Sequence, residues 1–318
     1  MIRILALLVA LSFAAGASAQ QWPTRPLRYI ITYPPGGPAD ILARMVAAKL
    51  GDRLKQQVVV DNRPGGGGNI GAELTARAAP DGYTIFMMAS THAANMTLYA
   101  KPGYSVTKDF AHITNIAGYP LLFVVHPRIT AKDMREFIVY ARTNPGRLSY
   151  ASAGSGGGAH LAMELFRSMV GLEMVHIPYK GQGPALQDVI GGQVELTFAS
   201  VSAALPHVSA GRLRVLGISS AERLRSLPEV PTVSEAGVAG YELESWLGMS
   251  APAGTPTAIV QRLNEETAAV VADPEFAERL RRDGAASKVS SPERFSAYVE
   301  GEVTRWAKLV RESGAKPE

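Results

Sequence analysis

Two glycine-rich stretches combine residue types that suit the binding of a small anion. The first is Tyr33–Asp40 (YPPGGPAD) and the second is Ala153–His160 (AGSGGGAH). Each follows a strand-like apolar run and precedes a helical pattern. The first N–H groups of a helix have no partner within the helix and carry partial positive charge, and glycine lets a ligand approach the backbone closely. Both stretches therefore predict an anion-binding turn.

The elements that must position these turns alternate between strand and helix patterns. Strands are predicted at 27–31, 57–60, 84–88, 148–152, 174–177, 194–198 and 213–219, with two further strands in 110–125 that are broken near Gly118. Helices are predicted at 41–50, 72–78, 133–143 (with Thr130 as N-cap), 159–166, 184–190, 255–272, 274–282 and 292–311. Strand–helix–strand order predicts parallel sheets with right-handed crossovers, and so an α/β fold.

Further polar residues follow the carboxyl ends of predicted strands. Ser90, Thr91 and His92 follow the strand at 84–88, Tyr179 follows 174–177, and Ser200 follows 194–198. Ligands of open α/β sheets bind at the carboxyl ends of strands. We therefore expect these residues and the two turns to gather at one site, where turns on two domains hold a ligand by both ends.

The N-terminus predicts export. Arg3 precedes an apolar run at 4–15 that is too short to span a bilayer, and Ala17-Ser18-Ala19 fits the small-residue cleavage rule, so residues 1–19 are predicted to be a signal peptide. The 318 residues suggest about two domains, and the chain has no cysteine. The predicted export fits the absence of cysteine. It also argues against a nucleotide cofactor, because nucleotides are scarce outside the cytoplasm. The net charge is +4, and the basic residues are scattered along the sequence, which argues against nucleic-acid binding.

Two enzyme hypotheses arise from the second turn, and neither is favoured. Gly154-x-Gly156-x-x-Ala159 matches a dinucleotide fingerprint, but Glu173 stands at the start of the next strand and not at its end. Ser155 lies in a near-match to a nucleophile elbow, and no spacing selects His176 or His207 as its base.

Metal binding is not predicted either. The six histidines form no i, i+4 pair and no pattern with carboxylates: His92, His112, His126, His160, His176 and His207. His160 is the one histidine in the first turn of a predicted anion-site helix, where a ligand contact and a structural role are both open. The chain is predicted to be a binding protein with no cofactor and no metal, and not an enzyme.

Six motifs, in their order along the chain, closely resemble those of one family, the Bug-type extracytoplasmic solute-binding receptors of tripartite tricarboxylate transporters. They are YPPGGPAD at 33–40, NRPGGGGNIG at 62–71, PDGY at 80–83, YASAGSGGGAH at 150–160, HIPYKG at 176–181 and LPEVPTVSEAG at 227–237. The resemblance covers essentially the whole chain after residue 19. It implies a periplasmic, type II-like binding protein (a Venus flytrap), with parallel or mixed sheets in two α/β domains joined by two crossovers.

The resemblance also implies a domain division, a site and a partner. Domain 1 would comprise 20–125 and 245–318, and domain 2 would comprise 126–244, with hinges near 125–126 and 241–246. The ligand would be a small carboxylate, delivered by a monomeric receptor to a membrane permease of this transporter type. Its contacts would be Tyr33, Gly36, Gly37, Asp40, Ser90, Thr91 and His92 in domain 1, and Ser152, Gly154, Ser155, Gly156, Tyr179 and Ser200 in domain 2, with His160 beside them.

Some alternatives stay open at this point. Pro38 stands where the family usually has a small or polar residue, and it removes one N–H donor. Asp40 is a carboxylate beside a predicted anion site, so it either caps free N–H groups and orders water or favours a ligand with an ammonium group. A periplasmic serine hydrolase using Ser155 and a ligand-presenting sensory module remain alternative functions, and the identity of the carboxylate does not carry over.

Overall fold

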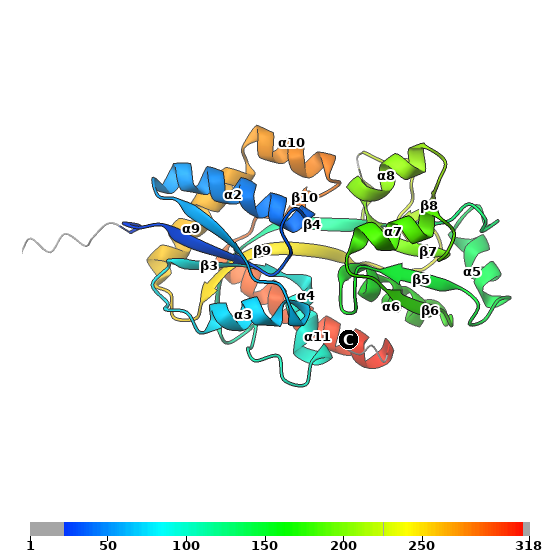
Figure 1. Cartoon of the computed structure of the whole chain (residues 1–318), viewed down its shortest axis with the longest axis horizontal. Helices are drawn as coiled ribbons and strands as arrows, with labels where there is room; N and C mark the ends of the chain where they lie inside the picture. Colours follow the sequence, from blue (N-terminus) through cyan, green and yellow to red (C-terminus); the bar gives the residue numbers. More distant parts are fainter. Residues whose placement is uncertain (1–21, 225, 314–318) are drawn as a thin grey trace, which may run out of the picture.

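The computed structural model describes residues 22–224 and 226–313, so the predicted signal peptide at 1–19 lies outside the described residues. Within them, none of the helices combines the length and apolar character needed to cross a bilayer. Two α/β lobes lie side by side along the long axis of the molecule (Figure 1).

The first lobe is built on three parallel strands. Their order is β2 (Val58–Asn62), β1 (Leu27–Ile31), β3 (Thr84–Ala89), and β9 (Glu244–Pro252) and β4 (Phe110–Val125) continue the sheet in antiparallel fashion. The helices of this lobe are α2 (Pro38–Leu54), α3 (Asn69–Ala76) after the 3₁₀ turn η1 (Gly66–Gly68), α4 (Ser90–Leu98), α9 (Thr257–Val271), α10 (Pro274–Arg282) and α11 (Pro292–Ser313). The short β10 (Ala286–Ser287) pairs with β4.

The second lobe repeats this plan. Its parallel strands are β5 (Ser149–Ser152), β6 (Val175–Pro178) and β7 (Leu196–Ser200), and β7 and β8 (Arg214–Ile218) both pair antiparallel with β4. Its helices are α5 (Met134–Arg142), α6 (Gly158–Val170), α7 (Gln182–Ile190) and α8 (Val201–Ser209). The predicted α/β alternation is confirmed in both lobes.

Strand β4 belongs to both lobes. The expectation of two strands broken near Gly118 was wrong, because β4 is continuous from Phe110 to Val125 and Gly118 pairs with both β9 and β10. A Cβ at Gly118 would lie 2.7 Å from Glu244 Oε2 and from Lys288 Cε, two side chains whose charged ends form a 2.8 Å ion pair. The glycine makes room for that ion pair and does not end the strand.

The register of β4 shows where the lobes meet. Its pairing with β9 ends at Pro120, opposite Glu244, and its pairing with β7 begins at Leu121, opposite Ser200. Ser200 is the carboxyl end of β7. The carboxyl end of β3, Ala89, pairs with β9 close to the same junction. The carboxyl edges of the two parallel sheets therefore face each other across this point. The domain division at 125 and 245 stays a prediction. The register favours a first crossing between the lobes at Pro120–Leu121, earlier in the chain than residue 125.

Two helix starts were not expected from the sequence. Ser90–His92 form the first turn of α4, and Ser200 is the N-cap of α8. The predicted cap of α5 was also wrong, since Asp133 and not Thr130 is the N-cap, with its carboxylate accepting from Glu136 N at 2.9 Å. A side chain directly before the helix reaches the free N–H groups better than one farther upstream.

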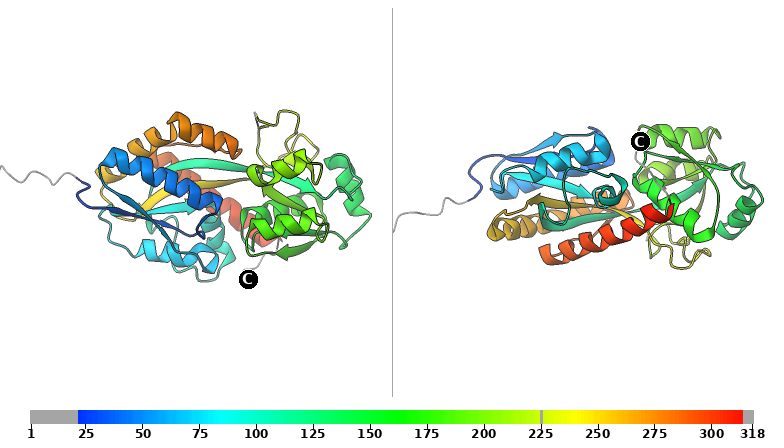
Figure 2. Two further views of the ribbon diagram at one scale, coloured as in Figure 1. Left: turned by 45° about the horizontal axis from the view of Figure 1, so that its top comes forward. Right: turned by 90° about the horizontal axis from the view of Figure 1, so that it is seen from below.

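The C-terminal helix α11 runs from the first lobe to the second and packs on both α4 and α6 (Figure 2). On α11, Phe295, Val299, Trp306 and Leu309 are buried, whereas Tyr298 is 39% exposed.

The second crossover is tied to α11 by a buried carboxylate. Glu302 accepts hydrogen bonds from the indole N–H groups of Trp246 (2.9 Å) and Trp306 (3.0 Å), and Arg305 donates to the Glu242 carbonyl. The start of β9 is therefore fixed to the C-terminal helix.

Candidate functional site

Six helices of the described chain begin where a parallel strand ends. In the first lobe, α2, α3 and α4 follow β1, β2 and β3; in the second, α6, α7 and α8 follow β5, β6 and β7. Because parallel strands share one carboxyl edge, the six helix starts lie along the two edges that face each other at the lobe junction. Each start adds partial positive charge from unpaired N–H groups. The junction is therefore suited to a negatively charged ligand.

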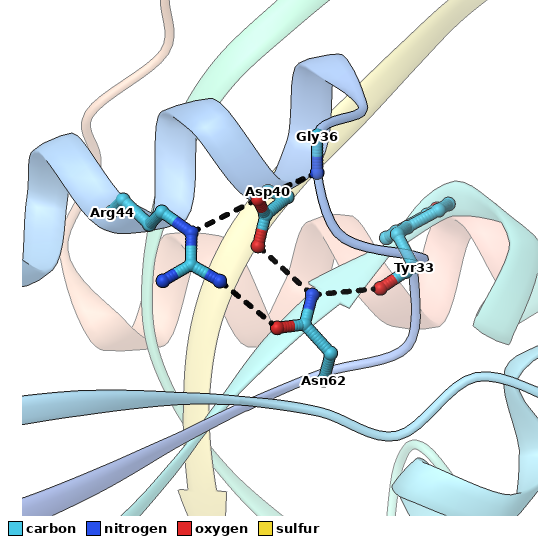
Figure 3. A network of polar contacts seen from close by, with 5 residues as sticks. All are labelled: Tyr33, Gly36, Asp40, Arg44 and Asn62. Atoms are coloured by element: carbon cyan, nitrogen blue, oxygen red, sulfur yellow. Dashed lines mark hydrogen bonds and ion pairs between the residues drawn. The ribbon is translucent and has the colours of Figure 1, made fainter.

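The first turn is closed by Asp40, which is 2% exposed. Its Oδ2 accepts hydrogen bonds from Gly36 N and Arg44 Nε, both at 2.9 Å, and its Oδ1 accepts one from Asn62 Nδ2 at 2.9 Å (Figure 3). Burial alone would raise the pKa of Asp40, but the bonds from Arg44, Gly36 and Asn62 outweigh it and hold the pKa at about 2. Asp40 is therefore a buried, paired anion.

These contacts bear on the two readings of Asp40. Its carboxylate bonds the N–H of Gly36, which precedes the helix, and the N-cap Gly37 carries no side-chain cap. Both carboxylate oxygens have donors within the protein, so the geometry does not favour an ammonium group of a ligand as their partner. Gly36 has φ +83°, in the left-handed region that favours glycine, and this conformation directs its N–H back to Asp40.

Tyr33 and Thr91 meet beside the first turn. Tyr33 is half-buried, its hydroxyl lies 3.4 Å from Thr91 Oγ1, and its carbonyl accepts from Asn62 Nδ2 at 3.0 Å. Burial raises the pKa of Tyr33. Ser90, the neighbour of Thr91 in the first turn of α4, is 3% exposed. The structure thus brings the turn after β1 and the start of α4 together.

His92 is fully buried beneath this group. Its Nδ1 accepts from Ala89 N at 2.9 Å, so the proton is on Nε2, which donates to Thr32 Oγ1 at 3.2 Å. Burial lowers the pKa of His92 to about 4, which keeps the ring neutral. With both ring nitrogens bonded inside the domain, His92 holds the start of α4 in place, and a direct ligand contact stays only a prediction.

The second turn has the same frame. Gly156 has φ +76°, and its N–H donates to His160 Nδ1 at 2.9 Å, as Gly36 donates to Asp40. The N-caps correspond as well: Gly157 has φ −72° and ψ 162°, Gly37 has φ −78° and ψ 166°, and neither helix has a side-chain cap at this position. The two turns are therefore copies of one backbone design.

The anchor of the second turn is an uncharged ring. His160 is 4% exposed, and burial, together with nearby His176 and Arg167, lowers its pKa to about 3. Ser152 is fully buried, and its Oγ lies 2.7 Å from His176 Nε2 and accepts from Gly154 N at 3.2 Å. The Ser152 hydroxyl is thus engaged within the domain. Ser155, on the same turn, is half-buried.

Tyr179 and Ser200 lie at the ends of β6 and β7. The Tyr179 hydroxyl donates to Asp188 Oδ2 at 2.6 Å, and burial together with this bond raises the pKa of Tyr179 to about 12. Ser200 Oγ accepts from Gln182 Nε2 at 3.0 Å. Both predicted residues therefore stand at the carboxyl edge of the second sheet, with their hydroxyls hydrogen-bonded to α7.

The second turn also touches the first lobe. A Cβ at Gly156 would lie 2.6 Å from Leu98 Cδ2 and 3.9 Å from Asn95 Oδ1, both on α4. A Cβ at Gly158 would collide with Ser245 at the start of β9. The structure thus brings the turn at 154–158 directly against the first lobe.

An open groove of about 720 Å³ lies elsewhere, on the outer side of the first lobe between α2 and β2. It contains none of the predicted site residues; Arg44, Ala47, Lys55, Gln57 and Val59 are among those that line it. We do not assign it to the ligand. In 22–224 and 226–313 no three His, Asp or Glu side chains gather as a metal site would require.

Sequence reasoning missed Arg44, Asn62 and His176, which support the anchors of the two turns. Arg44 had a readable signal, because it follows Asp40 by four positions on a helix and so lies on the same face. Asn62 opens the motif NRPGGGGNIG at 62–71, where its residue type suggested only a turn. No local pattern marks His176 as the neighbour of His160.

Comparison with known proteins identifies the family. A family model described as tripartite tricarboxylate transporter family receptor matches residues 42–315. The structure of Rpa4515 from R. palustris with adipate is 38% identical, with TM-score 0.84 over 93% of this chain and 100% of that one. The periplasmic binding protein BugD is 33% identical, with TM-score 0.82 and the same coverage. MatC (Rpa3494) from Rhodopseudomonas palustris with bound malate is 30% identical, with TM-score 0.80 over 91% and 100%.

These matches confirm the predicted resemblance and the predicted fold, an α/β periplasmic binding protein fold. They also decide between receptor and enzyme, because the family consists of solute-binding receptors, and the hydrolase reading of Ser155 is dropped. The chain belongs to the family of tripartite tricarboxylate transporter receptors.

Proposed function

We propose that this receptor binds a small carboxylate at the lobe junction, between the turn of α2 and the turn of α6, and delivers it to the membrane permease of a tripartite transporter. Two solved relatives support the ligand class, one with adipate and one with malate. The observation that carries the proposal is the set of six helix starts along the two facing carboxyl edges. Such starts stabilise an anion without a buried cation.

The anchors limit which N–H groups a carboxylate can use. Gly36 N and Gly156 N already donate to Asp40 and His160. The first-turn N–H groups of the two helices, such as those of Ala39 and Ala159, are the donors that remain, because no N-cap side chain covers them. We therefore assign to Gly36, Gly37, Gly154 and Gly156 the shaping of the turns, with the ligand oxygens held at the helix starts.

Location and partner follow from the family. A solved relative is described as a periplasmic binding protein. We propose that residues 1–19 direct this chain to the periplasm as a signal peptide, and that the mature protein acts as a monomer. The family name supports a transporter partner. A permease of the same transporter type would then receive the ligand.

A thermal-shift screen tests the ligand class. The panel contains adipate, malate, citrate, benzoate and aspartate, with dimethyl adipate and 1,6-hexanediol as uncharged controls. At a hundredfold excess over Kd, a cognate ligand adds about 2.7 kcal/mol of stability, which raises Tm by roughly 5–10 °C. The controls should leave Tm unchanged. No shift with any carboxylate at millimolar concentration, or an equal shift with the ester, would contradict the proposal.

A further inference from the structure

Two histidine rings are stacked beneath the second turn. His160 on α6 and His176 on β6 have ring centroids 4.1 Å apart and planes within 12° of parallel. Tyr150 on β5 continues the stack, 4.9 Å from His176. His160 is almost fully buried and His176 is half-buried. Three elements of the second lobe thus meet in one stack below the residues that shape the turn.

Each histidine holds a different part of the turn. His160 Nδ1 accepts from Gly156 N at 2.9 Å, near the end of the turn. His176 Nε2 lies 2.7 Å from Ser152 Oγ, and that oxygen accepts from Gly154 N at 3.2 Å, at the beginning of the turn. The stack joins these two supports, because the two rings pack directly against each other.

The first turn has the same two-part support. Asp40 holds Gly36 N and is itself held by Asn62, which stands at the end of the neighbouring strand β2. His160 holds Gly156 N and rests on His176, which belongs to the neighbouring strand β6. An anchor four residues after the glycine, backed by a side chain from the next strand, therefore occurs on both sides of the junction.

We propose that His160 and His176 are positioning residues of the ligand site: they fix the second turn through Nδ1 and Nε2, as Asp40 and Asn62 fix the first. The proposal rests on the proposed function in so far as the second turn binds the carboxylate. The rings act through the turn and touch no ligand atom.

Burial, together with His176 and Arg167, keeps His160 neutral. Arg167 on α6 forms an ion pair with Glu164 at 3.1 Å and donates to the Met174 carbonyl at 2.8 Å, and Glu164 accepts from the Tyr150 hydroxyl. Arg167 and the second ring both oppose a proton on His160, whose pKa lies well below its usual range. A neutral Nδ1 is required, because a protonated ring cannot accept from Gly156 N.

Matched substitutions separate the hydrogen bond from the ring. His160→Asn places an amide oxygen at the δ1 position, and His176→Gln places a polar atom at the ε2 position; His160→Leu and His176→Leu fill space without an acceptor. His207→Leu, in the last turn of α8, is the control for the same change in the same lobe. Affinity for adipate and malate is measured by calorimetry, and amide exchange of Gly154 and Gly156 by NMR.

We expect the Asn and Gln variants and the His207 control to keep wild-type affinity within about threefold, and the two Leu variants to lose about tenfold or more. Without ligand, Gly156 should exchange faster in His160→Leu, and Gly154 in His176→Leu, with protection restored in Asn and Gln. Leu variants that bind and exchange like the wild type would overturn the positioning role, as would Asn and Gln variants as weak as Leu.

The exchange measurement needs no ligand, so the two hypotheses fail separately. If the wild type binds no carboxylate but the variants show the predicted exchange pattern, the proposed ligand class is refuted and the positioning role is supported. Circular dichroism of each variant shows whether it is folded, and the Asn and Gln variants test the role even where a Leu variant is unstable.

Discussion

The turns at 36–40 and 156–160 share a backbone and differ in the chemistry of their anchors. In both, a glycine with positive φ donates its N–H to the side chain four residues later. The first anchor is a carboxylate with its charge balanced by Arg44; the second is a neutral imidazole that burial and Arg167 keep unprotonated. The turn therefore requires a fixed acceptor at this position, and that acceptor need not carry a charge.

Because one anchor is charged and the other neutral, the two anchors are stabilised by different contacts. A buried carboxylate without donors is costly, so Asp40 depends on three hydrogen bonds. A neutral ring costs little to bury and depends instead on packing against His176. The first turn is thus vulnerable to loss of charge pairing and the second to protonation.

The largest effect is expected from Asp40→Ala, which leaves Gly36 N, Asn62 and Arg44 without their shared acceptor. We expect a loss of about 3 kcal/mol of stability, because hydrogen bonds to a buried charge are strong, and a loss of the thermal shift with carboxylates. Asp52→Ala, an exposed position on the same helix, should change stability by less than about 0.5 kcal/mol. Urea denaturation checks both values. Similar losses in the two variants would show that Asp40 is no special anchor.

Acid should affect the second turn at a higher pH than the first. The pKa of His160 is lowered from 6.5 to about 3, so the unfolded chain binds more protons between these values and stability falls as pH falls through that window. For Asp40 the corresponding window runs from 3.8 to about 2. Between pH 7.5 and 4.5, His160 should account for a loss on the order of 2 kcal/mol.

The comparison of wild type with His160→Asn isolates this contribution, because His92 and His112, with pKa values lowered to about 4, titrate in both proteins. Denaturation across the pH range should show a shallower decline in the variant. Parallel declines would mean that His160 does not titrate as its burial predicts.

A smaller effect is expected from alanine substitutions at Gly36 and Gly156, and it should differ between the two positions. Gly36→Ala and Gly156→Ala should each lose about 1 kcal/mol from strained positive φ. A Cβ at Gly36 meets nothing within 4 Å, whereas one at Gly156 meets Leu98 of the first lobe at 2.6 Å. Affinity for adipate should therefore fall further in Gly156→Ala, and Leu98→Ala in the same chain should restore part of it. Equal affinities in the two single variants would show that the second turn does not approach α4.

The sequence predicts the strand–turn–helix units because their signals are local. Glycine and proline mark both turns, and the apolar runs mark β1 and β5. The start of α4 was missed because Ser90, His92, Ala93, Ala94 and Asn95 are all buried, so the helix shows no alternation of polar and apolar faces. The continuity of β4 was missed because Gly118 resembles a strand end until the Glu244–Lys288 pair beside it is seen.

The candidate site could be predicted in outline from the sequence, but the hydrogen bonds and ring contacts inside it could not. The positions of Asp40 and His160 four residues after a glycine are visible in the sequence, but their roles depend on Asn62 and His176, which are brought in by the neighbouring strands. Such contacts arise from sheet register, which no short motif encodes.

The carboxylate of Glu302 links two tryptophans, whose fluorescence can be measured. It joins the indoles of Trp246, at the start of β9, and Trp306, on α11, and these are two of the three tryptophans in the chain. A change in geometry at the second crossover would alter the hydrogen bond between Trp246 and Glu302, whereas the bond from Trp306 lies within α11. A Trp22→Phe protein would keep only this pair of tryptophans, so its tryptophan emission would report on the geometry of the second crossover without an added label.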